Sequence, residues 1–191
     1  MSGQGFRRVA ERDVHQGYIW RVVTATFEDP AGESFQRDIV RSPGAVGVVP
    51  LLFDAEGTPA VVLIRQWRPP YEKELWEIPA GMRDVPGGDV GRLARRELVE
   101  EAGYRAAHVD LLVELYPSPG LTDSVTTIYL ATGLEPVDRE VHGPEEEHST
   151  VCVVPLVDAV ALVERGEIPD AKSAVGLLLT ARRVERGDHA G

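Results

Sequence analysis

The sequence predicts a mixed α/β fold in which strands and helices share an apolar core. Short runs rich in Val, Leu and Ile lie between turn residues, as in AVGVVPLLF (45–53) and AVVLIRQ (60–66). Later segments change to helical periodicity, most clearly at 156–165 and 171–186. With 191 residues, 43% of them apolar, the chain is long enough for one domain of ordinary size and an extra element. Strands with interspersed helices are typical of an α/β sandwich.

The first 43 residues are expected to form a small antiparallel β unit of their own. Residues 1–17 indicate a flexible start. Two β-rich stretches follow, 18–27 and 36–40, joined by the turn-like EDPAGES. Ser42-Pro43-Gly44 marks the boundary with a second domain, residues 44–191.

The second domain should contain six strands and three helices. Besides 45–53 and 60–66, strands are expected at 75–78, 109–116, 125–131 and 151–154. The polar, acidic segment 135–149 indicates a loop. Three helices are expected: one before the fourth strand, and the two amphipathic helices near the C-terminus.

Acidic residues outnumber basic residues by 31 to 20, which gives a net charge of −11. This charge argues against non-specific binding to nucleic acid or to an anionic membrane, because both need a basic surface. A polyanionic small molecule stays compatible if a divalent cation reverses the field locally. The N-terminus has no apolar signal region, and no stretch of about 18 apolar residues occurs. We therefore expect a cytoplasmic protein.

Three glutamates at i, i+3 and i+4 are the first candidate for chemistry: Glu97, Glu100 and Glu101. A helix is expected around them, with Asp89 as its N-cap and Gly103 just past its end. On a helix this spacing places the three carboxylates on one face, where like charges at i,i+4 cost roughly 0.2–0.5 kcal/mol. Two interpretations remain open. The face is either solvated and balanced by neighbouring arginines, or a site for a hard cation such as Mg²⁺ or Mn²⁺.

These residues resemble the Nudix box, G-x5-E-x7-R-E-U-x-E-E-x-G-U, in which U is a bulky apolar residue. Gly81 supplies the opening glycine, and RELVEEAGY from Arg96 to Tyr104 fills the closing half in order. Arg96 lies fifteen residues after Gly81, one more than in the pattern, and Gly88 stands where the first glutamate is expected. The resemblance implies a Nudix α/β/α sandwich with the small antiparallel β unit before it.

The same resemblance implies a set of site residues. Glu97 and Glu101 would hold Mg²⁺, or Mn²⁺, together with the backbone carbonyl of Ala80. Glu100 lies alongside, and Arg96 would orient the glutamates.

A second motif, Ser118-Pro119-Gly120, is a rigid turn between two strands on any interpretation. Pro119 lies fifteen residues beyond the box, and SPGLTDS resembles a loop of the ADP-ribose pyrophosphatase subgroup. Ser124 stands where an acidic residue is common in that group. The resemblance implies that Pro119 and Gly120 contact the substrate.

The run Glu145-Glu146-Glu147 lies before the last strand. Such runs are usually solvated and inert. In the subgroup that the sequence resembles, a loop at this place carries a glutamate that completes the catalytic site. We favour Glu146 or Glu147 for that role, with the register left open.

Three further candidates concern substrate binding. Arg68, in QWR, resembles the strand end at which the subgroup places an arginine for phosphate, and guanidinium groups suit phosphate oxygens. The alternative is a surface arginine beside a core tryptophan. Trp20 could stack on adenine, or serve core or dimer packing. Glu77 is a weaker candidate for substrate contact.

The resemblance implies an enzyme that hydrolyses the pyrophosphate bond of ADP-ribose to AMP and ribose 5-phosphate, and a homodimer that exchanges its N-terminal units. Alternatives are a Nudix pyrophosphatase for another nucleotide sugar or dinucleotide, a non-catalytic module that senses ADP-ribose, and a protein whose box helix is only structural. In every interpretation except the last, the binding partner is a small nucleotide. We expect no binding to nucleic acid or to a membrane.

Overall fold

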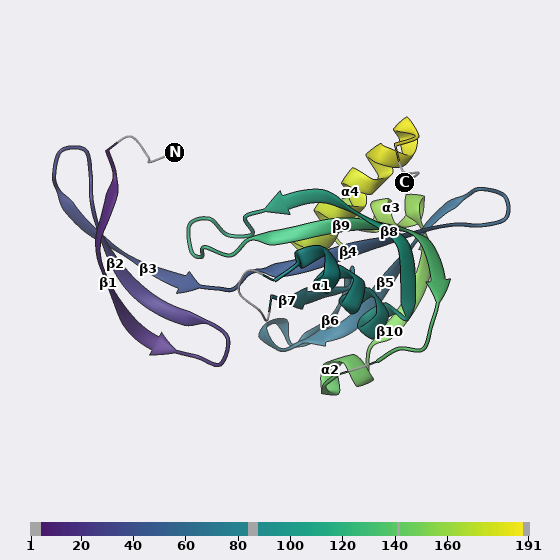
Figure 1. The fold of residues 1–191 in the computed structure, drawn as a ribbon, viewed down its shortest axis with the longest axis horizontal. Coiled ribbons are helices and arrows are strands. Elements are labelled where there is room, and N and C mark those ends of the chain that lie inside the picture. Colours follow the sequence, from purple (N-terminus) through teal and green to yellow (C-terminus); the bar gives the residue numbers. More distant parts are fainter. Residues whose placement is uncertain (1–4, 84–87, 141, 189–191) are drawn as a thin grey trace. The chain divides into compact units, whose positions relative to one another are not determined.

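The structure is a computed structural model that describes residues 5–83, 88–140 and 142–188. The chain divides into two compact units. The first comprises the chain up to Gly44 together with Tyr116–Val125, and the second comprises Ala45–Leu115 and the chain from Thr126 onward. The Ser118-Pro119-Gly120 turn therefore belongs to the first unit, although it lies far from that unit in sequence. Figure 1 shows the elements of both units.

The first unit is a three-stranded antiparallel sheet in the order β1-β2-β3, with β1 Arg7–Gln16, β2 Arg21–Glu28 and β3 Ser34–Arg41. The expectation of a flexible start was wrong for Arg7–Gln16, and residues 1–4 lie outside the described part of the chain. The ten residues of β1 are all exposed, so its sequence has no buried apolar alternation to reveal it. The strand forms by pairing with β2 along its whole length.

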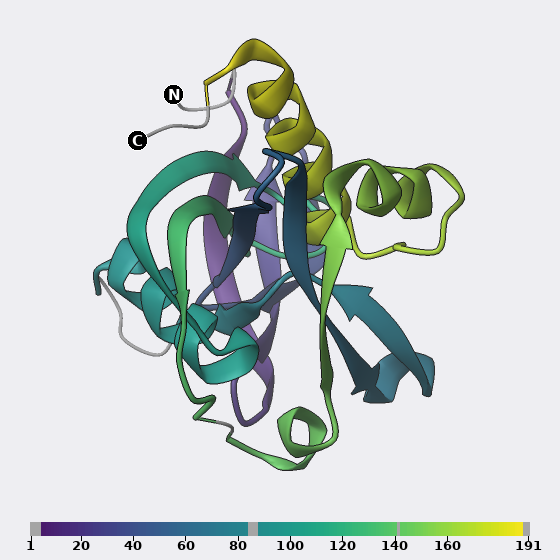
Figure 2. The same cartoon turned by 90° about the vertical axis from the view of Figure 1, so that its right-hand side faces the viewer.

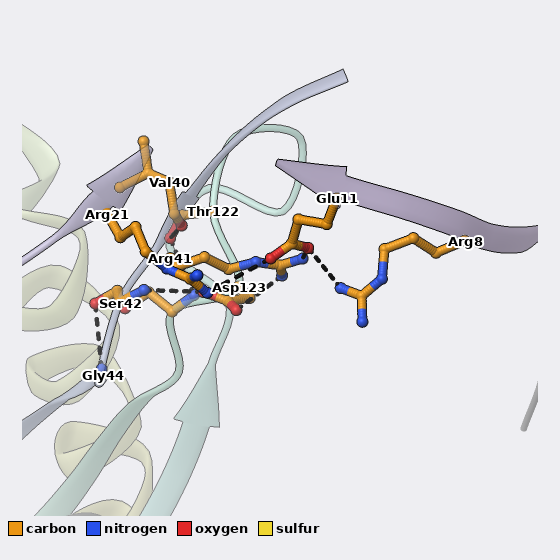
Figure 3. A network of polar contacts seen from close by, with 10 residues as sticks. Arg8, Glu11, Arg21, Val40, Arg41, Ser42, Gly44, Thr122 and Asp123 are labelled. Carbon is orange, nitrogen blue, oxygen red and sulfur yellow. Dashed lines mark hydrogen bonds and ion pairs between the residues drawn. The ribbon is translucent and has the colours of Figure 1, made fainter. Parts of the chain in front are cut away.

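A polar network joins β1, β3 and the inserted segment of the first unit (Figure 3). Arg41 donates to Glu11 on β1 and, at 3.0 Å, to Asp123. Asp123 also accepts from the backbone amide of Ser42 at 3.0 Å. The hydrogen bonds to Arg41, first of all, and the nearby arginine charges hold the pKa of Glu11 below its ordinary value. Charge-assisted contacts thus tie the segment that carries the Pro-Gly turn to the sheet.

The second unit contains a mixed sheet in the order β10-β5-β4-β9-β8. Its strands are β4 Ala45–Phe53, β5 Pro59–Arg68, β8 Tyr104–Leu115, β9 Thr126–Pro136 and β10 Thr150–Pro155. Two short strands extend it: β6 Lys73–Glu77 pairs with β5, and β7 Ala80–Met82 pairs with the start of β4. β4 and β9 run parallel, and the other pairs are antiparallel. The six expected strands are confirmed, and β7 was missed because three residues are too few to show a pattern.

Helices cover both faces of this sheet, so the expected α/β/α sandwich is confirmed (Figure 2). Alternation along β4 separates two cores: Val46 and Val48 pack with the box helix, whereas Val49 and Leu51 pack beneath the C-terminal helices. The box helix is α1 Val90–Glu97, continued by a π-helical turn, η2 Leu98–Ala102. On the other face lie α3 Leu156–Glu164 and α4 Ala171–Arg186.

Within the expected loop 135–149, the structure contains one short helix, α2 Pro144–Glu147. The loop also begins later than expected, because β9 continues to Pro136. Among the described residues, no helix is long and apolar enough to cross a membrane.

Candidate active site

The helix of the box begins and ends where local signals place it. The Asp89 carboxylate accepts hydrogen bonds from the amides of Gly91 at 2.9 Å and Arg92 at 3.2 Å, so it satisfies two unpaired donors of the first turn. Gly103 ends the helix at φ 72°, a left-handed conformation that glycine adopts without strain. Between these ends the last turn widens into η2, which carries Glu100 and Glu101. Such π-helical turns are frequent at functional sites.

Glu97 and Glu101 are buried, with only 6% and 4% of their surface exposed. Oε2 of Glu101 accepts a hydrogen bond of 2.7 Å from the backbone amide of Ala80. Oε1 of Glu97 lies 3.1 Å from a guanidinium nitrogen of Arg96. Arg96 also pairs with Glu100 at 3.5 Å, so one arginine contacts two glutamates of the box. The three glutamates, Arg96 and Ala80 are therefore brought together as expected.

Burial is the main cause that raises the pKa of Glu101 to about 8, and the charges of Glu97 and Glu146 raise it further. The Ala80 hydrogen bond lowers it but does not balance the other effects. Burial likewise raises the pKa of Glu97, with repulsion from Glu100 and Glu146 against attraction to Arg96. Two buried carboxylates that resist ionisation in this way would be stabilised by a cation.

The charge of Glu146 acts on both buried carboxylates, so α2 brings this residue toward the box. Its Oε2 accepts a hydrogen bond of 2.7 Å from the backbone amide of His142. The His142 ring lies 3.6 Å from Glu100. Glu147 is exposed, and its charge is not among the causes of either pKa shift. Of the two glutamates that the sequence favours, Glu146 is the one whose charge acts on the box carboxylates.

Arg68 and Glu77 form a second polar cluster. The arginine donates two hydrogen bonds to the carboxylate, from Nε to Oε1 at 2.6 Å and from Nη2 to Oε2 at 2.7 Å. Burial raises the pKa of Glu77, but the hydrogen bonds and charges of Arg68 and Lys172 outweigh it and hold the pKa below its ordinary value. Lys172 donates to Glu77 and, at 2.9 Å, to Asp170. Arg68 is thus no simple surface arginine.

Sequence reasoning missed Lys172, which joins the cluster from α4. The separation of 95 residues between Lys172 and Glu77 gives no local signal. Composition gave one hint, since Lys73 and Lys172 are the only lysines in the chain.

The remaining candidates belong to the first unit. Pro119 and Gly120 line a hollow of about 560 Å³ together with aromatic, aliphatic and arginine side chains of β2 and β3. Trp20 does not line this hollow. It lies between β1 and β2 and is 49% exposed, so core packing within the described residues does not explain it.

Gly88, which departs from the box pattern, lies just before the helix and lines a hollow of about 420 Å³ with Arg83, Arg92 and Arg96. Three arginines and the carboxylate of Asp89, which caps the helix, thus surround this part of the box. Of these arginines, Arg96 pairs with Glu97 and Glu100, as described above.

The NUDIX domain model matches residues 41–175. The chain belongs to the Nudix family of hydrolases. It is 34% identical to an ADP-ribose pyrophosphatase of Mycobacterium tuberculosis (strain ATCC 25618 / H37Rv), over 93% of this chain and 84% of that protein. It is 32% identical to an ADP-ribose pyrophosphatase of Bacillus subtilis (strain 168), over 90% of each.

The chain is also similar to a protein with a different name and to a solved structure. A methanol dehydrogenase activator of Bacillus methanolicus is 29% identical over 90% of each chain. A solved structure described as an ADP compounds hydrolase superimposes with a TM-score of 0.82 and covers all of both chains at 24% identity. At that identity the structural likeness concerns the fold.

Proposed function

We propose that this Nudix hydrolase cleaves the pyrophosphate bond of ADP-ribose to AMP and ribose 5-phosphate with the help of Mg²⁺ or Mn²⁺. The observation that carries the proposal is the pair Glu97 and Glu101, two buried carboxylates whose pKa values are both raised. The names of the Mycobacterium and Bacillus subtilis relatives support the choice of substrate.

The donor set suits a hard divalent cation. All candidate ligands are oxygens: the carboxylates of Glu97 and Glu101 and the carbonyl of Ala80. Among the described residues, no three His, Cys, Asp or Glu side chains are arranged as a ready metal site. Magnesium does not require one, because it retains several waters and is usually held by one or two carboxylates plus substrate phosphates. When bound, it would neutralise phosphate charge and lower the pKa of water.

The chain's own residues would do the rest. Arg96, which contacts Glu97 and Glu100, would keep both carboxylates oriented. Glu146 would position or deprotonate the attacking water, and its charge already acts on Glu97 and Glu101. Glu147, whose charge is not among the causes of either pKa shift, is the alternative base.

Arg68 and Glu77 would contribute to substrate binding together. Glu77 engages Nε and Nη2 of Arg68 and so fixes the guanidinium plane, which leaves Nη1 for a phosphate oxygen. Pro119, Gly120 and Trp20 of the first unit would shape the site for the nucleotide. Trp20 offers a half-exposed ring for stacking on adenine.

We further propose a homodimer in which residues 1–43 act as the dimerisation and substrate element and residues 44–191 as the hydrolase domain. All ten residues of β1 are exposed, and the turn after it adds Tyr18, Ile19 and Trp20 as exposed large apolar side chains. Such a surface is typical of a binding interface. Light scattering at micromolar concentration should give twice the monomer mass, and a monomeric mass would contradict this proposal.

The activity test is direct. Purified protein with ADP-ribose and Mg²⁺ or Mn²⁺ should release AMP, measured by chromatography, and EDTA should stop the reaction. The values of kcat/KM for ADP-ribose, GDP-mannose and NADH should then be compared. GDP-mannose is included because a GDP-mannose pyrophosphatase of Citrobacter koseri is 32% identical over 68% of this chain. Turnover of GDP-mannose or NADH instead would change the substrate and keep the chemistry. Tight binding of ADP-ribose without any turnover would show a sensor.

A further inference from the structure

Arg139 connects the end of the box helix to the loop that carries Glu146. Its side-chain stem covers Gly103, where a Cβ would lie only 2.8 Å from Cγ of Arg139. The carbonyl of Gly103 accepts a 2.9 Å hydrogen bond from the amide of Val137. Glycine at position 103 therefore serves twice, once for its left-handed backbone and once to let Arg139 approach. The segment before the loop is docked on the helix end.

From its position on Gly103, Arg139 extends its guanidinium group into the loop that carries Glu146. Its Nη2 donates to Oγ of Ser149 at 2.7 Å and makes a longer contact of 3.5 Å to the carbonyl of Glu146. Ser149 continues the chain of bonds, because its Oγ donates to the same carbonyl at 2.8 Å. The amide of Ser149 donates to it as well, at 3.1 Å. The backbone of Glu146 is thus held through Ser149.

This anchor opposes an electrostatic force. Oε2 of Glu146 accepts from the amide of His142 at 2.7 Å, and the His142 ring lies 3.6 Å from Glu100, so the loop brings a further carboxylate toward the acidic box, where like charges repel. Helix α2 is a single turn of four residues with no side-chain cap at its start, and it cannot resist that repulsion by itself.

We propose that Arg139 is a positioning residue that holds Glu146 beside the Glu97–Glu101 pair before cation and substrate arrive. The inference rests on the proposed function only in taking Glu146 as the residue that handles the attacking water. Nε of Arg139 supports a site-directed role, since it is buried without a partner among the described residues. An unpaired buried donor is costly, so a general packing role would be served better by an apolar side chain.

The first test needs no activity. In wild type, the amides of His142, Glu147 and Ser149 are hydrogen-bonded within the loop. In Arg139→Gln they should exchange with deuterium about tenfold faster or more, while the amides of η2 keep their rates. Arg105→Gln is the matched control, because this exposed arginine is the second residue of β8, lies two residues after Gly103 and bonds to nothing in the loop among the described residues. Equal exchange in Arg139→Gln and wild type would overturn the proposal.

The second test separates positioning from folding. Arg139→Gln should lower kcat on the order of 10–100-fold with little change in KM, because a misplaced base costs rate more than binding. The rise of Tm with Mg²⁺ should persist, since Glu97 and Glu101 are unchanged. Arg139→Lys should recover part of kcat, and Ser149→Ala should reproduce part of the loss.

Other results have distinct meanings. Unchanged kcat in Arg139→Gln would refute the positioning role. If Arg139→Gln lowers Tm, raises KM and abolishes the rise of Tm with Mg²⁺ together, its structural damage hides the positioning effect. The milder variants Arg139→Lys and Ser149→Ala then decide: a lower kcat at unchanged Tm supports the proposal, and an unchanged kcat refutes it. Wild type that never hydrolyses ADP-ribose would refute the proposed function, whereas the exchange experiment would still report whether Arg139 holds the loop.

Discussion

The carboxylate of Glu97 fills the space that a side chain at Gly81 would need. A Cβ at position 81 would lie 2.3 Å from both Cδ and Oε1 of Glu97. This contact joins the opening glycine of the box to a glutamate of its closing half. The spacing in sequence therefore reflects a physical requirement, namely a bare backbone beneath a buried carboxylate.

Substitution Gly81→Ala should displace Glu97. We expect overpacking to reduce stability by about 1–3 kcal/mol. A misplaced ligand should lower kcat/KM by about 10²-fold and weaken the rise of Tm caused by Mg²⁺. Thermal melts with and without Mg²⁺, and AMP release, measure both effects. Gly91→Ala is the control on the same helix, because its Cβ would meet nothing closer than 3.4 Å and should cost neither activity nor stability.

The metal-free protein should lose stability as pH rises from 4.5 to 8. Glu101 ionises at its ordinary value of 4.5 when unfolded but at about 8 when folded. In that window the folded state retains a proton that the unfolded state has released, so rising pH favours unfolding. Denaturant unfolding in EDTA should show a slope on the order of 1 kcal/mol per pH unit from this group. A flat profile would contradict the burial of its charge.

Replacement Glu101→Gln should separate stability from function. The amide oxygen can still accept from the Ala80 backbone, and no charge is buried, so metal-free Tm at pH 8 should stay equal or rise. The Tm increase with Mg²⁺ and most of the AMP release should disappear. Glu164→Gln, an exposed position on α3, is the matched control and should retain both. Retention of the Mg²⁺ effect in Glu101→Gln would place the cation elsewhere.

Removal of the Lys172 charge should weaken the Glu77 cluster mainly above pH 4.5. The pKa of Glu77 is held low, so its ion pairs contribute stability that is present above 4.5 and is lost as pH falls through the folded pKa. Lys172→Met should therefore cost about 1–3 kcal/mol near neutral pH and progressively less in acid. Lys73→Met, the other lysine, is exposed and should leave urea unfolding unchanged.

The network of Figure 3 predicts how the first unit responds to Arg41→Ala. Arg41 contacts both Glu11 and Asp123, so its loss should release the segment that carries Pro119. Hydrogen exchange should then accelerate about tenfold at the amides of Val40 and Ser42, which bond to that segment. Arg12→Ala, on exposed β1, is the control. Unchanged exchange in Arg41→Ala would show that backbone pairing alone holds the segment.

Local signals in the sequence were sufficient for much of the fold. Asp89 and Gly103 limited the box helix correctly, because an N-cap and a left-handed C-terminus are encoded within a few residues. Strand β1 was not predictable in the same way, since pairing and not burial defines it. The contacts of Lys172 and Arg139 depend on residues that approach only after folding, so they gave no local pattern.

The enclosed ion pair of Lys172 has a chemical consequence. A chain with two lysines offers amine-directed reagents few targets, and these two differ: Lys73 is exposed, whereas Lys172 is held by Glu77 and Asp170 with 15% of its side chain accessible. Acylation needs a free, unprotonated amine, so it should modify Lys73 quickly and Lys172 only while its ion pairs are broken. The rate at which Lys172 is labelled, followed by peptide mass spectrometry, would then time the opening of that cluster without any introduced probe.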